Sequence, residues 1–472
     1  MKKNTAEKYT FETHRKTLLT DLLTPVSIYL KIRDRFPNSI LLESSDYHAN
    51  TIGFSYICMA PVASFKIQNN LLQTSFPDGS TQTAALEASA DIPALLADFQ
   101  QRFSIAPNTE KDYIQQGLFG YMGHEMVQYY EGTNISQKPD SADIPDLYYA
   151  FYRHVIAINH FNNETYLFDH CWNTQNRLEE LENILRSPSP ITYPFQKEGE
   201  KNSNMTDEDF LGLVDVAQKH CQRGDVFQLV LSRRFSQHFS GDEFQVYRAL
   251  RAINPSPYLF YFDYGDFKIF GSSPEAQLIV ADGQAEIHPI AGTFKRTGND
   301  AEDAALAQKL ADDPKENAEH VMLVDLARND LSRNGSEVSV VTNREVQFFS
   351  HVIHLVSKVI ARKKPSIETF QVVADTFPAG TLSGAPKPKA LELIERYEPT
   401  NRKTYGGAIG FLDFEGNFNH AIIIRSFLSQ RKTLYYQAGA GLVAASTPAN
   451  ELQEVYNKLG ALDRALEKAE QL

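Results

Sequence analysis

The chain has 472 residues, of which 42% are hydrophobic and 30 are phenylalanine, enough apolar material for one large or two ordinary globular domains. Its formal net charge of −13 argues against a nucleic-acid partner, because such a partner would require a basic surface. The three cysteines, Cys58, Cys171 and Cys221, lie far apart without metal-binding spacing, so the sequence indicates neither a disulfide framework nor a zinc site and fits a reducing, cytoplasmic compartment.

The first third of the chain is predicted to be β-rich. It begins with a polar segment, residues 1–8, and no run of about 18 apolar residues occurs anywhere, so we expect a protein that is neither secreted nor membrane-spanning. Between 40 and 76, short runs of β-branched and aromatic residues are separated by turn-forming residues such as Pro61. A second strand-like block covers 148–158.

A polar, proline-bearing segment separates two predicted domains. Residues 187–190 read Ser-Pro-Ser-Pro, and the charged run 196–203 that follows has the composition of a linker. We therefore predict an N-terminal β-rich domain over 1–190, a linker over 191–205 and a second, larger domain over 206–472.

The second domain is predicted to alternate helices with hairpin-like strands. We expect helices at 206–222, 301–312 and 314–331, and strands at 226–236, 258–263, 267–271, 276–281, 405–413, 419–428 and 433–438. This arrangement in blocks favours an α+β fold over a doubly wound sheet.

The last predicted helix carries two carboxylates on one face. Pro448 suits the first helical position behind a Thr447 cap, and Glu451 and Glu454 lie three residues apart within the helix. They follow a glycine-containing segment, 439–441, that we expect to form a loop.

A second glutamate pair with the same spacing lies upstream. Glu316 and Glu319 follow Asp313 and Pro314, which also suit a helix start. Two such pairs facing each other would hold a hard cation such as magnesium, whose remaining ligands come from water and from an anionic substrate. Two simpler interpretations are a capping box formed by Asp313 and Glu316, and a solvated helix face.

Three more features have competing interpretations. Residues 439–444 superficially match a dinucleotide fingerprint, but their glycines could equally offer backbone N–H groups to a carboxylate or form a tight turn. His354, in an apolar run, is either a core histidine or a base. Arg425 ends an apolar strand-like run, where a guanidinium must be paired or contact an anion.

Together, these motifs resemble the chorismate-utilising enzymes, and within them the anthranilate synthase large components. The matching stretches occur in one order between 206 and 460, at 224–232, 254–258, 289–293, 316–320, 325–331, 377–387 and 437–441. The resemblance implies a large two-lobed α+β fold, with antiparallel β-sheets in a sandwich-like core flanked by helices.

The resemblance also implies a metal site and a substrate site. Glu319 and Glu454 match direct magnesium ligands, with Glu316 and Glu451 beside them as ligands through water or as substrate partners. The groups that would bind chorismate are Tyr405, Arg425, the backbone of Gly439, Ala440 and Gly441, the charge partner Lys458, and the ring or side-chain contacts Gly292 and Thr293.

Family chemistry assigns roles to three further side chains. Ammonia attacks the chorismate ring while the 4-hydroxyl leaves, and the aminated intermediate then loses pyruvate. Glu275 resembles the acid that assists hydroxyl departure, and His354 the group that handles the ring proton, which suits a base of near-neutral pKa. Thr381 resembles a supporting hydrogen-bond donor.

Two positions discriminate within the family. Gln228 stands where isochorismate- and salicylate-forming relatives carry a water-activating lysine, and Ala291 stands where aminodeoxychorismate-forming relatives often carry a lysine. Both favour anthranilate formation, and an aminodeoxychorismate synthase is the nearest competing function. The sequence also leaves open a dehydrogenase that uses 439–444 and a noncatalytic regulatory relative.

Two partners follow from the same resemblance. No cysteine lies in a glycine elbow, so ammonia is expected from a separate glutamine amidotransferase subunit in a hetero-oligomer. L-Tryptophan is expected as a feedback inhibitor, because residues 41–44 resemble the family's tryptophan-binding signature. The predicted inhibitor site consists of Leu42, Glu43, Ser44, Asn254, Pro257, Tyr258 and Leu259.

Overall fold

The computed structural model describes residues 8–44, 53–107, 113–139, 142–188, 191–348 and 352–472. The first part of the chain is β-rich, as the sequence predicted. Its elements are β1 (Tyr9–Leu19), α1 (Pro25–Ile32), β2 (Ile40–Ser44), β3 (Phe54–Gln68), β4 (Leu71–Ser75), β5 (Thr81–Ala85), α2 (Ile92–Gln100), β6 (Phe103–Ile105), β7 (Gly117–Met122), η1 (His124–Met126), α3 (Val127–Tyr130), β8 (Leu147–Asn159), β9 (Glu164–Cys171) and α4 (Leu178–Leu185).

The remainder alternates helices and strands in blocks. Its elements are β10 (Phe195–Ser203), α5 (Asp207–Arg223), β11 (Gln228–Gly241), α6 (Phe244–Ile253), β12 (Tyr258–Asp263), β13 (Phe267–Ser273), β14 (Ala276–Ala281), β15 (Gln284–Ile287), β16 (Ile290–Lys295), α7 (Asp300–Asp312), α8 (Pro314–Ser332), β17 (Gly335–Phe348), β18 (Val352–Lys363), α9 (Thr369–Thr376), α10 (Gly380–Ser383), β19 (Gly384–Ala385), α11 (Lys387–Tyr397), β20 (Ala408–Asp413), β21 (Phe418–Ile422), β22 (Ser426–Gln430), β23 (Thr433–Leu442) and α12 (Pro448–Ala469).

Strands from the two parts of the chain share hydrogen bonds and a core. β2 pairs with β12, so that Leu42 lies opposite Phe260, and β7 pairs with β20, so that Tyr121 lies opposite Ile409. All four side chains are buried in one aromatic-rich cluster. Among the described strands only β1 and β6 pair in parallel, and the other pairs are antiparallel. The predicted α+β fold with an antiparallel, sandwich-like core is therefore confirmed.

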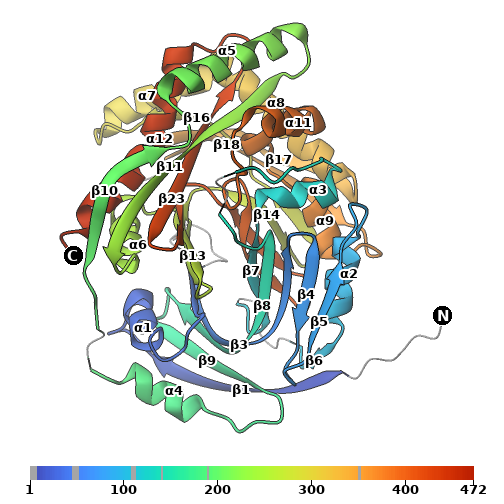
Figure 1. Ribbon diagram of the computed structural model, residues 1–472, viewed down its shortest axis with the longest axis vertical. Coiled ribbons are helices and arrows are strands. Elements are labelled where there is room, and N and C mark those ends of the chain that lie inside the picture. The colour runs from blue at the N-terminus through green and yellow to red at the C-terminus, as the bar shows by residue number, and fades with distance from the viewer. Residues whose placement is uncertain (1–7, 45–52, 108–112, 140–141, 189–190, 349–351) are drawn as a thin grey trace.

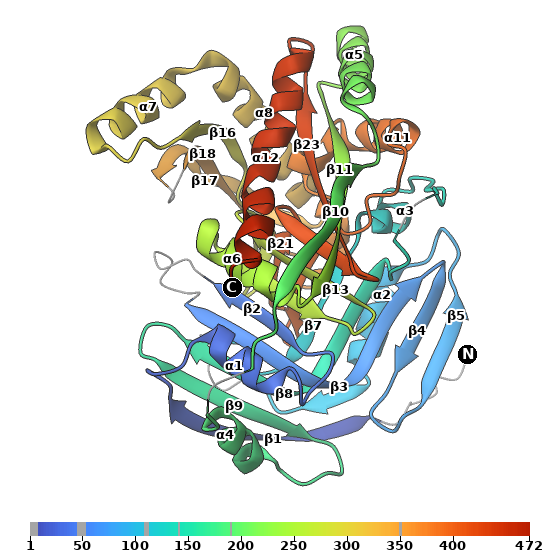
Figure 2. The ribbon, with the colours of Figure 1, turned by 60° about the vertical axis from the view of Figure 1, so that its left-hand side comes forward.

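The two lobes are visible in the ribbon views. The N-terminal strands β1, β3, β8 and β9 curve around one end of the molecule, whereas α5, β11, α8 and α12 lie at the other (Figures 1 and 2). No described helix is both long enough and apolar enough to span a bilayer.

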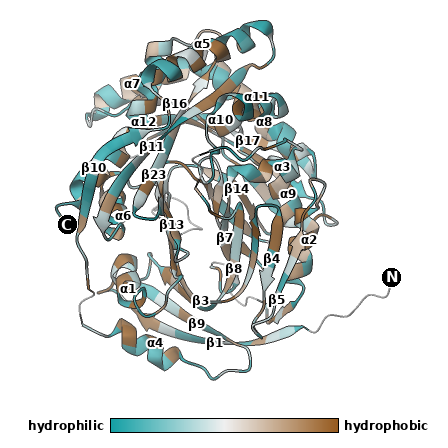
Figure 3. Ribbon diagram, viewed as in Figure 1, coloured by the Kyte–Doolittle hydropathy of each residue, from teal (hydrophilic) through white to brown (hydrophobic). Residues whose placement is uncertain are grey.

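The segment predicted to be a linker, 191–205, contains a strand instead. β10 pairs antiparallel with β11, from Phe195 opposite Gly241 to Ser203 opposite Phe235. Phe195 is its one buried residue, and the rest of the strand is exposed or half-buried and hydrophilic (Figure 3). The polar composition of this segment therefore reflects a solvated strand.

Two more expectations about local structure are wrong. The strand predicted over 419–428 is broken, because β21 ends at Ile422 and β22 begins at Ser426. Arg425 lies in this break with a left-handed φ of 49°. The expected glycine loop 439–441 is part of strand β23, and β17 and β18, which the sequence did not predict, form a long hairpin.

The predicted helix starts are confirmed. α8 begins at Pro314, and the Asp313 side chain accepts the Glu316 backbone N–H at 3.1 Å, which is half of a capping box. α12 begins at Pro448 behind Thr447, but the Thr447 side chain makes no capping hydrogen bond.

Candidate active site

The break between β21 and β22 places Arg425 near a predicted catalytic group, Glu275, and a predicted substrate-binding group, Tyr405. Burial lowers the pKa of its guanidinium, and the nearby Glu275 and Tyr405 oppose that shift. The Arg425 side chain makes no hydrogen bond or ion pair with any residue that the structure describes. Because a desolvated guanidinium without an anionic partner is costly, this position is suited to an anionic ligand.

Strand β23 forms one wall beside Tyr405. A Cβ atom at Gly439 would lie 3.1 Å from the Tyr405 hydroxyl, and a Cβ at Gly441 would lie 2.7 Å from Nε2 of Gln228. Larger residues at these two positions would displace Tyr405 and Gln228, so the glycines are required for close approach. Within the described strands, pairing with β22 stops at Tyr436, which leaves that edge of β23 without a strand partner from Gln437 onward.

The dinucleotide interpretation of 439–444 is wrong. The fingerprint requires a parallel β-strand, helix, β-strand unit with the phosphates at the helix N-terminus. β23 instead runs antiparallel to both neighbours, β11 and β22.

Glu275 is a half-buried residue whose carboxyl is held by Thr381. The Thr381 hydroxyl donates a 3.0 Å hydrogen bond to Oε1 of Glu275. Burial raises the pKa of Glu275 to about 7, against the opposing effects of Thr381, Arg425 and Lys458. A carboxyl with this pKa is protonated in part of the molecules at neutral pH and can donate a proton to a leaving group.

His354 lies on β18 and is 8% exposed. Its Nδ1 is 2.7 Å from the Gly292 carbonyl oxygen, which can only accept, so Nδ1 carries the proton and Nε2 the lone pair in the neutral ring. Burial lowers the pKa of His354; the bond to Gly292 opposes that effect and Arg425 adds to it. The imidazole is therefore a neutral base at pH 7. Thr293 lies opposite His354 in the β16–β18 register.

The glutamates predicted to bind metal lie on two helices, Glu316 and Glu319 on α8 and Glu451 and Glu454 on α12. Glu454 forms a 2.7 Å ion pair with Lys458, whose ammonium also donates to the Gly439 carbonyl at 2.8 Å. A Cβ at Gly292 would lie 3.1 Å from Oε2 of Glu316, so α8 brings this carboxylate against β16. Glu451 is buried and Glu319 is half-buried.

These carboxylates do not form a closed metal cage. Among the described residues, no group of three or more histidine, cysteine, aspartate or glutamate side chains is close enough together to hold an ion. Magnesium is commonly bound by only one or two carboxylates, with substrate oxygens and water completing its shell. The donor set on α8 and α12 fits that open type of site.

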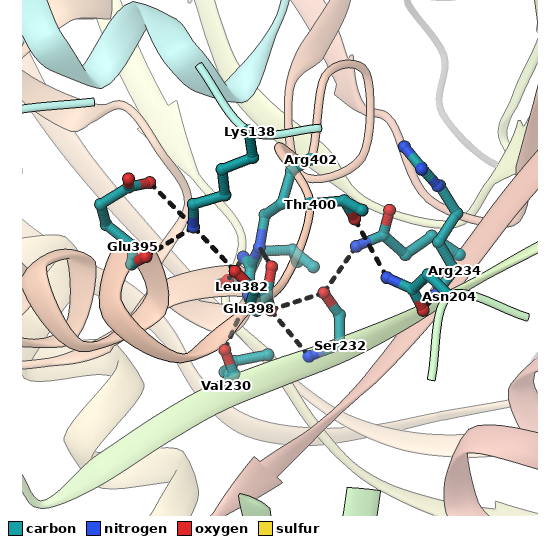
Figure 4. A network of polar contacts seen from close by, with 11 residues as sticks. Lys138, Asn204, Val230, Ser232, Arg234, Leu382, Glu395, Glu398, Thr400 and Arg402 are labelled. Carbon is teal, nitrogen blue, oxygen red and sulfur yellow. Dashed lines mark hydrogen bonds and ion pairs between the residues drawn. The ribbon is translucent and has the colours of Figure 1, made fainter. Parts of the chain in front are cut away.

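A buried network that the sequence analysis missed lies beside strand β23, because Ser232 in the network lies opposite Gly439 in that strand. Arg402 donates to Oε2 of Glu398 at 2.8 Å, to the Leu382 carbonyl at 2.7 Å and to the Val230 carbonyl at 2.8 Å (Figure 4). Glu398 in turn accepts the Ser232 hydroxyl at 2.7 Å. The network joins α10, which carries Thr381, to β11, which carries Gln228. Only Glu398 and Arg402, four residues apart, are close in the sequence; the other members are up to 172 residues away, so sequence spacing gave no signal for the network as a whole.

The predicted inhibitor residues come together on two neighbouring strands. Ser44 lies opposite Tyr258 and Glu43 opposite Leu259 in the β2–β12 pair. The carboxylate of Glu43 is already engaged: Arg251 donates to both its oxygens at 3.0 Å, and the Tyr247 hydroxyl donates to Oε1. The sequence analysis did not identify either partner. Asn254, the C-cap of α6, accepts the Ser272 hydroxyl through its carbonyl oxygen.

Comparisons with known proteins identify related sequences. The chain is 36% identical to "Anthranilate synthase component 1" of Acinetobacter calcoaceticus, in an alignment covering 95% of this chain and 94% of that protein. It is 34% identical to the protein of the same name from Aquifex aeolicus, covering 96% and 94%.

Solved structures show the same fold. The anthranilate synthase component I of Streptococcus pneumoniae superposes with a TM-score of 0.75 at 31% identity, over 94% of this chain and 98% of that one. The Escherichia coli menaquinone-specific isochorismate synthase MenF has a TM-score of 0.72 at 17% identity, over 97% and 95%, and shares the fold. Because the family model for chorismate binding enzymes also matches residues 25–464, this chain belongs to the chorismate binding enzyme family.

Proposed function

We propose that this chain converts chorismate and ammonia to anthranilate and pyruvate, as the large subunit of an anthranilate synthase. The observation that carries the proposal is the Arg425 guanidinium, which has no described protein partner and lies within electrostatic reach of both Glu275 and His354. An anion-binding group close to both an acid and a base is the arrangement that a carboxylate substrate with two proton-transfer steps requires.

Substrate binding is assigned to Arg425, Tyr405 and the edge of strand β23. Its guanidinium can bind one chorismate carboxylate with two hydrogen bonds, and Tyr405 can add a hydroxyl donor. The strand edge from Gly439 to Gly441 can supply backbone N–H groups. Lys458 holds that edge through its bond to the Gly439 carbonyl.

Proton transfer is assigned to Glu275 and His354. Glu275 gives its proton to the departing 4-hydroxyl as ammonia attacks the ring, and the Thr381 hydroxyl stabilises the resulting carboxylate. Nε2 of His354 then takes the ring proton as the enolpyruvyl group leaves and the ring becomes aromatic. Gln228, a neutral amide, is not a base and does not activate a water nucleophile, which leaves ammonia as the attacking group.

Magnesium is assigned to Glu319 and Glu454, with Glu316 and Glu451 acting through water. When bound, the ion would neutralise a substrate carboxylate and orient the ring. The carboxylates themselves fix where that charge is placed, one pair on α8 and one on α12.

Ammonia is assigned to a separate glutamine amidotransferase subunit. Glutamine hydrolysis needs a thiol with a lowered pKa. Burial instead raises the pKa of all three cysteines, Cys58, Cys171 and Cys221. The chain alone is therefore expected to use ammonium and not glutamine.

The experiment is incubation of the purified chain with chorismate, magnesium and either ammonium or glutamine. Fluorescence and mass spectrometry should identify anthranilate and pyruvate with ammonium only. A product that retains the enolpyruvyl group would indicate an aminodeoxychorismate synthase and overturn the proposal. Glutamine-dependent turnover by the chain alone would overturn the assignment of a second subunit.

Feedback inhibition by L-tryptophan is assigned to the β2–β12 pair. Ser44 and Tyr258 offer polar groups, Leu42 and Leu259 an apolar wall, and Glu43 an acceptor whose orientation Arg251 and Tyr247 fix. A 10-fold loss of chorismate affinity requires about 1.4 kcal/mol of coupling. Tryptophan titration of the wild type and Ser44→Phe at fixed chorismate should show inhibition of the former alone; identical curves would remove this site.

A further inference from the structure

A small cavity lies behind Glu275, on the side formed by α8 and α9. Its volume is about 30 Å³, and Glu275, Gln277, Ala327, Asp330 and Thr376 are among the residues that line it. A cavity of about 10–15 Å³ on this measure can hold one water molecule if polar groups are present to bind it. The cavity therefore has room for ordered water.

Two lining residues carry oxygen atoms that the described structure leaves without a hydrogen-bond donor. They are Oε1 of Gln277 and Oδ1 of Asp330, and their residues are 3% and 4% exposed. Buried oxygen atoms of this kind normally have a protein or water partner, because an unmade hydrogen bond is costly.

Neighbouring contacts fix which atom of each side chain lacks a donor. The Thr376 hydroxyl donates to the Val372 carbonyl at 3.0 Å, so it must accept from Nε2 of Gln277, which is 3.1 Å away. The Gln277 amide cannot then be flipped, and Oε1 is the atom without a donor. Oδ2 of Asp330 accepts the Lys387 ammonium at 2.8 Å, which leaves Oδ1.

Thr376 connects the two residues. Its hydroxyl binds Gln277, and its carbonyl accepts the same Lys387 ammonium at 3.2 Å. A partner that donates to both Oε1 of Gln277 and Oδ1 of Asp330 would close a ring of hydrogen bonds. The Lys387 ammonium disfavours a second cation there, so the partner is a neutral donor of two protons, which describes water.

We propose that a water molecule bound in this cavity donates hydrogen bonds to Gln277 and Asp330 and accepts a hydrogen bond from the Glu275 carboxyl, so that Gln277 and Asp330 are positioning residues that keep Glu275 in its acid form. A water molecule with both protons engaged has only lone pairs left for Glu275. Such a water favours the neutral carboxyl, because it can accept from the acid but cannot donate to the carboxylate. This inference rests on the proposed role of Glu275 as the acid.

The charged groups around Glu275 act against this effect. Arg425, from the break before β22, and Lys458, from α12, both favour the carboxylate, as does the hydroxyl of Thr381 from α10. Asp330, which lines the cavity, is paired with Lys387. Apart from burial, the water is therefore the group proposed to favour the protonated form.

The first test is a crystal structure of the wild-type chain at a resolution that shows ordered water. We expect one water within hydrogen-bond distance of Oε1 of Gln277 and Oδ1 of Asp330. A dry cavity, or a side-chain rearrangement that satisfies both oxygens without water, would overturn the inference. This test does not depend on activity, so it remains decisive if the chain makes no anthranilate and the proposed function fails.

The second test is the pH profile of kcat for Gln277→Met, which keeps the length of the side chain and removes the acceptor. The water then has a spare proton to donate to the Glu275 carboxylate, so the basic limb should move to lower pH by about 0.5 to 1 unit. Gln245→Met is the matched control, because Gln245 is also buried but lies on α6, away from the cavity. A basic limb unchanged in Gln277→Met, or moved equally in both variants, would overturn the inference.

Discussion

Arg402 and Arg425 are two arginines of the same lobe, one buried and one half-buried, and their surroundings differ. Arg402 is 3% exposed and donates to a carboxylate and to two backbone carbonyls. Arg425 has no hydrogen bond or ion pair with the described residues. The comparison shows that burial alone does not reveal function: a guanidinium whose donors are satisfied by the fold is structural, whereas one without partners is suited to a ligand.

The largest expected effect is on stability. Arg402→Met removes the partner of Glu398, a buried carboxylate, and should lower the free energy of unfolding by about 3–5 kcal/mol. Urea denaturation measures this loss. The double variant Arg402→Met/Glu398→Leu should be more stable than the single variant, since it has no buried unpaired charge. A loss below about 1 kcal/mol for Arg402→Met would break the comparison, because that is the range of an exposed ion pair.

Arg425→Met should have the opposite effect: it should reduce activity and leave stability intact. Its stability should equal or exceed that of the wild type, while kcat/KM for chorismate should fall about 10² to 10³-fold, the cost of losing a desolvated charge contact. Arg431→Met is the matched control, because Arg431 is exposed and has a similar left-handed φ, 50° against 49°. If Arg425→Met unfolds as readily as Arg402→Met, Arg425 is structural.

The next prediction concerns His354, a residue with a proposed role in proton transfer rather than in binding. His354→Ala should slow loss of pyruvate by about 10²-fold or more and affect amination less, so an aminated, nonaromatic intermediate should accumulate. Chromatography of the reaction mixture measures both products. His238→Ala, at an exposed position of β11, is the control. Equal loss of both steps would make His354 a structural residue.

The smallest expected effect is the pH dependence caused by Glu275. Because the acid must be protonated, kcat should fall as pH rises through about 7, the pKa to which burial raises this carboxyl from its usual 4.5. Between pH 4.5 and about pH 7 the folded state holds a proton on Glu275 that the unfolded chain releases. The free energy of unfolding therefore falls as pH rises across this range.

Thermal unfolding at pH 5 and pH 8 measures the stability side of this effect. Glu275→Gln should reduce the difference in Tm between the two pH values, whereas Glu200→Gln, on the exposed strand β10, should leave it unchanged. An unaltered difference in Glu275→Gln would show that the carboxyl does not titrate in this window.

The sequence alone determined the elements whose signals are local. Pro314 and Pro448 begin α8 and α12 as predicted, because a proline at the first helical position needs no neighbour from elsewhere in the chain. The strands at 258–263 and 276–281 agree with β12 and β14 to the residue. Family motifs also named the residues that the fold gathers around Arg425.

Tertiary structure decided what depends on distant partners. β10 is a strand because β11 pairs with it, although its own composition is that of a linker. The break at Arg425 could not be predicted from the apolar run before it. Whether a buried polar group is satisfied was also undetermined: the Arg402 guanidinium is fully satisfied only because carbonyl oxygens of α10 and β11 reach it, and Gln277 and Asp330 border one cavity only because β14 and α8 both line it. Such contacts join residues far apart in the chain, and no local pattern encodes them.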